Sequence, residues 1–283
     1  MNQRSKCLVT MAIGADYLRM WESVFARTFR LYAEKHGYDV IVVTDHVDQS
    51  PAGRARGPHW QKLVLHRRPD IARYEHVVWI DADIMVNHLT APCIVAANAS
   101  DKIGAVTHNS FYTSPERWEN RWNRVYRNAG DLFRAPRGPT PSERYRQAGL
   151  PGDVDDMINT GVMVLKPRRH AELLEWIYAN CTENPLSASE QMPLSYHLFR
   201  NGMCNPIDPR FNRPWVEELA ECYPFLLQEQ NHKNQALVAY CVTAAWHNCY
   251  FLHFLADGYS RTDATLVLTD TPDAVTLYLG PKG

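Results

Sequence analysis

Two aspartates separated by one residue are the strongest chemical feature of the sequence. They follow an apolar run in residues 77–84, which read VVWIDADI. Residues i and i+2 of an extended chain point to the same side, so the carboxylates of Asp81 and Asp83 can converge on one cation. Carboxylate oxygens suit Mg²⁺ or Mn²⁺, which keep positions open for the phosphate oxygens of a substrate. The simpler alternative is a polar turn after a buried strand, but burying unpaired carboxylates costs several kcal/mol each, which favours a metal site.

Alternating strand and helix patterns place these aspartates at the edge of a sheet. Apolar runs predict strands at residues 7–13, 38–44, 77–80, 103–107 and 157–165. Helical spacing predicts helices at 18–32, 60–73, 171–179 and 189–201. Such an α/β order indicates a mainly parallel central sheet with helices on both faces. Ligands bind at the carboxyl ends of strands in such sheets, where the two aspartates lie.

The segment VVWIDADIMV resembles the signature strand of GT-A-fold, nucleotide-sugar-dependent glycosyltransferases. The resemblance is closest to the glycogenin-like group and to the fungal α-galactosyl/mannosyltransferase group. Four further elements of these groups occur in the same order: WQKL at 60–63, INTGVM at 158–163, Glu190-Gln191, and FLHF at 251–254. The resemblance covers residues 6–261 apart from an arginine-rich segment, and it implies a single GT-A domain over residues 1–283.

The resemblance also implies roles for individual residues. His253 would complete a Mn²⁺ or Mg²⁺ site with Asp81 and Asp83, although a lone histidine in an apolar stretch is more often a core residue. Glu190, Gln191 and Asn159 would lie at the reacting sugar, with Glu190 standing where the group has aspartate. The implied donor-binding residues are Thr10, Ala12, Lys62, Asp81, Ala82, Asp83, Asn159, Thr160, Gly161, Gln191 and Arg261. Arg261 is taken as a substitute for a lysine that the glycogenin-like pattern has and this chain lacks.

Several of these residues have a purely structural alternative. Lys62 could lie on a solvated helix face, and an acid such as Glu190 is favourable at the start of any helix. Asp155 and Asp156, the expected acceptor-binding residues, belong to a small acidic cluster that either binds hydroxyls of donor or acceptor or forms a solvated loop.

The domain is expected to have three parts. Residues 1–109 form the nucleotide-binding half, residues 110–152 an insertion or lid, and residues 153–283 the donor-sugar and acceptor half with a terminal hairpin built from 265–268 and 275–279. Eight arginines lie between residues 117 and 146. They could meet an anionic acceptor, make peripheral contact with a membrane, or form a solvated face.

Composition excludes several other classes of protein. The 283 residues carry 30 basic and 31 acidic side chains, which argues against a protein built to coat nucleic acid. The sequence has no phosphate-binding GxGxxG or GxxxxGK[ST] motif, and its seven scattered cysteines suit a reducing compartment. Residues 234–256 lack charged side chains but contain Asn, Gln and His, which favours buried core over a membrane helix. We therefore expect a cytoplasmic protein without a transmembrane segment.

The functional expectation is transfer of a hexose, with retention, from a UDP-hexose or similar donor to a glycan or glycolipid-type acceptor. Retention could involve departure and attack on the same face of the sugar, or a covalent intermediate on Glu190. A sugar nucleotidyltransferase and a catalytically silent nucleotide-sugar-binding protein are the alternatives.

Overall fold

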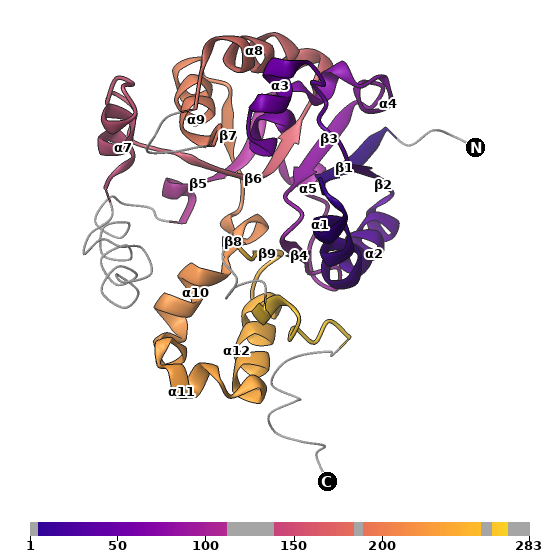
Figure 1. Ribbon diagram of the computed structural model, residues 1–283, viewed down its shortest axis with the longest axis vertical. Coiled ribbons are helices and arrows are strands. Elements are labelled where there is room, and N and C mark those ends of the chain that lie inside the picture. Colours follow the sequence, from indigo (N-terminus) through magenta and orange to yellow (C-terminus); the bar gives the residue numbers. More distant parts are fainter. Residues whose placement is uncertain (1–4, 112–138, 184–188, 256–261, 271–283) are drawn as a thin grey trace.

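A six-stranded sheet forms the centre of the protein (Figure 1). The computed structural model describes residues 5–111, 139–183, 189–255 and 262–270. The strands, in the spatial order β2-β1-β3-β6-β5-β7, are β1 (Lys6–Met11), β2 (Asp39–Val43), β3 (His76–Ile80), β5 (Ile103–Thr107), β6 (Ile158–Leu165) and β7 (Cys204–Pro206). Strand β6 is antiparallel to its neighbours β3 and β5, whereas the pairs β1–β2, β1–β3 and β5–β7 are parallel. The predicted α/β fold with a mainly parallel sheet is therefore confirmed.

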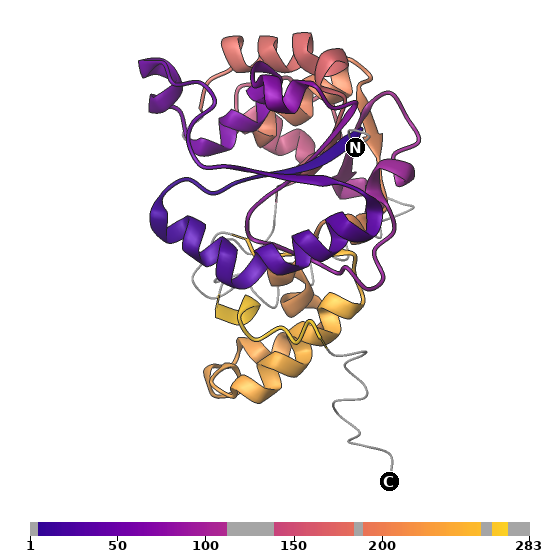
Figure 2. The same ribbon diagram turned by 90° about the vertical axis from the view of Figure 1, so that its right-hand side faces the viewer.

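Alternating side chains of the central strands build a separate core on each face of the sheet. On β1, Leu8 packs into one apolar cluster, whereas Cys7 and Val9 pack into the other. The first cluster is covered by α1 (Ala15–Met20), the π-helical η1 (Trp21–Phe25) and α2 (Ala26–His36). The second is covered by the 3₁₀-helix η2 (Pro58–Arg67), α8 (Pro167–Asn180) and α9 (Gln191–Arg200). Figure 2 shows the resulting three layers, with α2 and α8 on opposite sides of the sheet.

A second, three-stranded sheet joins the late part of the chain to the turn that follows β3. It contains β4 (Ile84–Val86), β9 (Phe251–His253) and β8 (Arg213–Pro214), with β9 in the middle. Ile84 is the register partner of His253, so this sheet carries the histidine to the two aspartates. The helices α10 (Trp215–Cys222), α11 (Glu229–His232) and α12 (Gln235–His247) extend below this sheet (Figure 1).

Three sequence expectations need correction or fall outside the described residues. The helix predicted over 60–73 is a 3₁₀-helix interrupted at Val64, followed by a separate α4 (Pro69–Ala72). Residues 265–268 form turns and irregular structure rather than the first strand of a hairpin, and 275–279 lie outside the described residues. Most of the arginine-rich segment is also outside them, although its end forms α7 (Pro141–Gln147), capped by Thr140.

The remaining short helices connect the larger elements. They are α3 (Pro51–Ala55), α5 (Ile94–Ala97), η3 (His108–Phe111), η4 (Pro209–Phe211) and η5 (Pro224–Leu227). All seven cysteines are free thiols. Among the described residues, none of the helices combines the length and the apolar character needed to cross a membrane.

Candidate active site

The three side chains predicted to bind a metal lie together beyond the carboxyl end of β3. Nε2 of His253 lies 3.3 Å from Oδ1 of Asp83 and 3.9 Å from Oδ2 of Asp81. One ligand atom from each residue lies within 4.8 Å of the others. Two carboxylates and one imidazole match the ligand preferences of Mn²⁺ or Mg²⁺, so the donor set fits such an ion. These residues could therefore hold a divalent cation.

Backbone pairing holds the three side chains in this arrangement. Residues 82 and 83 form a turn rather than the extended chain assumed from the sequence, and the Ile84 N–H donates to the carbonyl of Asp81 at 3.2 Å. Across the second sheet, the Phe254 N–H donates to the carbonyl of Asp83 at 2.8 Å. The Asp81 N–H donates to the carbonyl of Gly161 at 2.8 Å, which ties the turn to β6. The site thus lies where the two sheets meet.

Gly161 lets β6 approach the histidine closely. A Cβ at this position would lie 2.4 Å from Cε1 and 2.8 Å from Nδ1 of His253. No side chain fits at that distance unless the ring moves. Glycine at 161 is therefore required by the packing of the candidate metal site.

A buried ion cluster lies beside the aspartates. Nζ of Lys62 lies 3.0 Å from Glu190, 3.2 Å from Asp81 and 3.3 Å from the carbonyl of Thr160. The Lys62 side chain is 2% exposed and that of Glu190 is 1% exposed. The predicted solvated-helix alternative for Lys62 therefore does not hold. All three groups near the ammonium are oxygens of the protein, so Lys62 orients Asp81 and neutralises Glu190.

The same contacts shift the ionisation of the cluster. Burial alone would raise the pKa of Asp81, but Lys62, His253 and a hydrogen bond from Trp79 Nε1, 2.6 Å away, together hold the pKa below its usual value. Burial would lower the pKa of Lys62, yet the carboxylates of Asp81 and Glu190 hold the pKa above its usual value. Asp81 is therefore an anion and Lys62 a cation at neutral pH.

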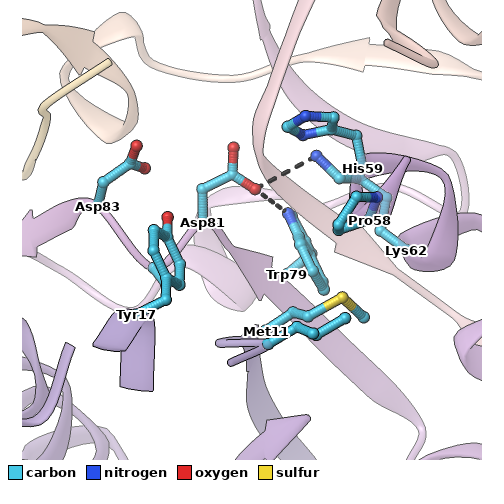
Figure 3. Close-up of a pocket in the computed structure, with 10 residues that line it drawn as sticks. Met11, Tyr17, Pro58, His59, Lys62, Trp79, Asp81 and Asp83 are labelled. Carbon is cyan, nitrogen blue, oxygen red and sulfur yellow. Dashed lines mark hydrogen bonds and ion pairs between the residues drawn. The ribbon is translucent and has the colours of Figure 1, made fainter. Parts of the chain in front are cut away.

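A pocket of about 270 Å³ opens next to Asp81 and Asp83 (Figure 3). Its charged wall contains Lys62, Asp81 and Asp83, while Met11 and Tyr17 contribute to its less polar part. Figure 3 shows one oxygen of the Asp81 carboxylate joined by dashed lines to both the Lys62 ammonium and the Trp79 indole. The pocket therefore combines a cation-binding edge with an aromatic and apolar surface.

The residues that line the pocket at the end of β1 are one position away from the ones predicted to bind the donor. Met11 and Ile13 line the pocket, whereas Thr10 and Ala12 are buried and do not. Side chains alternate along a strand, so the neighbours of the predicted residues face the open space. Ala82, another predicted donor-binding residue, does line the pocket.

The elements around β6 contribute mainly internal contacts. The Thr160 N–H lies 3.5 Å from Oε1 of Gln191, its hydrogen-bond acceptor. Oδ1 of Asn159 accepts a hydrogen bond from the Gly161 N–H at 2.9 Å. Asn159 and Thr160 thus flank Gly161, which packs against His253, and Gln191 contacts Thr160. Arg261 lies outside the described residues.

The two predicted acceptor residues differ in environment, and neither lines the pocket. Asp155 is exposed. Asp156 accepts hydrogen bonds from the N–H groups of Asn109 at 3.0 Å and Met157 at 2.8 Å. Burial raises the pKa of Asp156 more than these hydrogen bonds lower it. Asp156 therefore has a structural role in this loop.

Besides Met11, Ile13, Pro58 and Trp79, sequence reasoning missed three further residues of the site. Tyr17 and His59 line the pocket, and Asn212 is fully buried against His253. Tyr17 follows the first predicted strand, so its place near the ligand-binding edge could have been inferred. Asn212 and His59 lie outside any regular pattern and gave no signal.

Comparisons with known proteins support the fold. No protein-family model and no curated protein matches the chain. Among solved structures, a glycosyltransferase involved in the glycosylation of the major capsid of PBCV-1 matches with a TM-score of 0.51 and 13% identity, over 92% of this chain and 98% of that one. The bifunctional glycosyltransferase WbbM, in its apo form, matches with a TM-score of 0.54 and 12% identity, over 98% of this chain. This chain spans 52% of the length of WbbM.

These similarities extend over almost the whole chain at low sequence identity. They therefore describe the course of the backbone rather than the chemistry of the site. With the six-stranded sheet and the Asp-x-Asp turn beyond β3, the chain has the GT-A-type α/β fold seen in glycosyltransferases.

Proposed function

We propose that the protein is a metal-dependent glycosyltransferase that moves a hexose from a nucleotide diphosphate sugar, UDP-hexose in the first instance, to a hydroxyl of a glycan or glycolipid-type acceptor. The observation that carries the proposal is the Asp81–Asp83–His253 cluster at the edge of the 270 Å³ pocket. The acidic residues suit a cation, and the remaining wall suits a base and ribose. A nucleotide diphosphate combines these two chemistries in one ligand.

The residues of the chain would act by binding and orientation. When bound, Mn²⁺ or Mg²⁺ supplies positive charge to the diphosphate leaving group. Lys62 holds one oxygen of Asp81 at 3.2 Å, and the Trp79 indole N–H holds the same oxygen at 2.6 Å, which leaves the second carboxylate oxygen directed toward His253. The site thereby keeps its acidic ligands preorganised.

The burial of Glu190 supports retention without a covalent sugar adduct. A carboxylate that attacks the anomeric carbon must reach the bound sugar, whereas Glu190 is 1% exposed and paired with Lys62. We therefore propose departure and attack on the same face of the sugar, with Glu190 supporting Lys62. A glycosyl ester detected on Glu190 of the wild-type protein, and absent from the Glu190→Gln variant, would favour the covalent route instead.

The test is binding of nucleotide sugars with and without Mn²⁺, measured by calorimetry, followed by sugar-transfer assays on each donor that binds. Asp83→Asn should abolish Mn²⁺-dependent binding because it removes one of the two carboxylates. Asp70→Asn is a matched control, since Asp70 pairs with Arg68 on the protein surface.

Two other outcomes would contradict the proposal. Turnover of a nucleoside triphosphate with a sugar phosphate, and no turnover of UDP-sugars, would identify a sugar nucleotidyltransferase. Metal-independent binding of a UDP-sugar that Asp83→Asn leaves unchanged, with no hydrolysis or transfer, would identify a silent binding protein.

A further inference from the structure

A chain of hydrogen bonds leads from the backbone of β6 to the candidate metal ligand His253. It begins at the Gly161 N–H, which lies 2.9 Å from Oδ1 of Asn159. A backbone N–H can only donate, so the Asn159 atom that faces it must be the amide oxygen. The orientation of the Asn159 side chain is therefore fixed by the main chain.

Asn212 forms the next link. Its Nδ2 donates to the same oxygen of Asn159 at 2.9 Å and also lies 3.4 Å from the Asn159 carbonyl. Because the Asn159 atom is an acceptor oxygen, the Asn212 atom that faces it must be the amide nitrogen, which is the donor. The opposite side of the Asn212 amide, Oδ1, then faces Nδ1 of His253 at 2.9 Å.

The last link determines the state of the histidine ring. An amide oxygen only accepts hydrogen bonds, so Nδ1 of His253 must carry a hydrogen atom. In the neutral ring, Nε2 then has a free lone pair, and Nε2 is the atom that faces Asp83 at 3.3 Å. Asn212 is fully buried, so water does not compete for this contact.

We propose that Asn212 is a positioning residue, which fixes His253 as the Nδ1–H tautomer and holds its ring so that Nε2 can bind a divalent cation together with Asp81 and Asp83. The cation part of this inference rests on the proposed function. A histidine ligand requires a lone pair on the coordinating nitrogen, and the partner of its other nitrogen sets which tautomer is present. Without Asn212, both tautomers and several ring orientations would compete.

Packing against Gly161 strengthens the argument. The ring of His253 lies so close to this residue that even a methyl group would not fit between them. Steric contact therefore limits where the ring lies, and the Asn212 hydrogen bond limits which nitrogen faces the aspartates. With the steric contact alone, either ring nitrogen could face the aspartates. With the hydrogen bond alone, the ring could shift its position.

The first measurement uses ¹⁵N NMR of protein labelled at its histidine rings, without metal, at about pH 8.5, where an unperturbed imidazole is neutral. The His253 signals are assigned by comparison with His253→Gln. The wild-type protein should show the Nδ1–H tautomer for His253. An Nε2–H tautomer in the wild-type protein would overturn the inference by itself, without any Asn212 variant.

The second measurement compares Asn212→Leu, which removes the acceptor, with Asn212→Asp, which retains one. Loss of a partner of this kind typically costs about 10–100-fold in metal affinity, so Asn212→Leu should weaken Mn²⁺ binding by that factor and mix the tautomers. Asn212→Asp keeps the acceptor that faces Nδ1 but loses the donor to Asn159, so it should keep the Nδ1–H tautomer and recover part of the affinity. The control is Asn205→Leu, which removes a side-chain hydrogen bond from Asn205 on β7 to Asn98. It should leave both the Mn²⁺ affinity and the His253 tautomer unchanged.

The two proposals fail in different ways. If the wild-type protein binds no Mn²⁺, the proposed function is contradicted, while the tautomer still tests the role of Asn212. If the wild-type protein binds Mn²⁺ and Asn212→Leu binds it equally well with an unchanged tautomer, Asn212 has no positioning role and only this inference falls.

Discussion

Removing the ammonium group of Lys62 should strongly destabilise the protein. Lys62→Met keeps most of the volume of the side chain but deletes its charge, while Glu190 keeps its carboxylate. That carboxylate is 1% exposed, and among the described residues its two oxygens have no hydrogen-bond partner apart from their ion pair with Lys62. The variant therefore leaves a buried charge without compensation.

The magnitude follows from this burial. Breaking a buried pair by removing one partner costs about 3–5 kcal/mol of unfolding free energy. Asp81 should add little, because its side chain is 27% exposed and keeps the hydrogen bond from Trp79. Replacing both partners, as in Lys62→Met/Glu190→Met, removes the uncompensated charge and should recover most of the about 3–5 kcal/mol that Lys62→Met alone loses.

The assay is equilibrium unfolding in urea at neutral pH, followed by both circular dichroism and tryptophan fluorescence. Lys233→Met is the matched control, because its ion pair with Glu229 is exposed, with side chains 73% and 79% accessible. It should change the free energy of unfolding by at most about 0.5 kcal/mol. The reasoning is refuted if Lys62→Met lies within about 1 kcal/mol of the wild type, or if the double variant is no more stable than Lys62→Met.

Two further predictions test the glycine contact and a buried histidine. Gly161→Ala should weaken Mn²⁺ binding by at least about tenfold, because the new methyl group displaces the His253 ring; unchanged affinity in calorimetry would contradict the packing argument. Burial lowers the pKa of His170, whose Nδ1 accepts the Lys166 N–H at 3.1 Å. The unfolded chain therefore binds more protons than the folded one below about pH 6.5, and stability falls as the pH is lowered through and below this value. Between pH 7.5 and 5.5, wild-type protein should thus lose more unfolding free energy than His170→Gln, and equal losses would show that His170 does not contribute.

Much of the sheet could be predicted because its strands are continuous apolar runs. The segments β1, β3 and β6 are buried on both faces, so most of their residues are apolar and their limits are visible in the sequence. Because both faces of these strands are apolar, the sequence does not indicate which face meets the ligand. The choice of Thr10 and Ala12 over Met11 and Ile13 for the pocket could not be decided from a run in which both faces are apolar.

The candidate metal ligands could be predicted, but the residues that support them could not. Asp81 and Asp83 stand out because they are carboxylates inside apolar sequence, whereas His253 could be assigned only through the resemblance to the glycosyltransferase groups. Asn212 lies in an irregular segment before β8, and its contact with His253 depends on the pairing of β8 with β9. Glu190 precedes a helix, where acids are usually solvated, and only the packing of η2 against that helix start reveals its burial. Such roles arise from tertiary contacts between distant segments.

The position of His253 on β9 has a mechanical consequence. The aspartates lie between β3 of the six-stranded sheet and β4 of the three-stranded sheet, whereas the histidine lies on β9, which comes much later in the chain. An ion bound by all three side chains would be a reversible cross-link between these two parts of the chain. It would close a loop that contains β5, β6 and α8–α12. An ion that binds only the native state stabilises that state by mass action. The concentration of free metal would therefore set the free energy that holds the two sheets against each other.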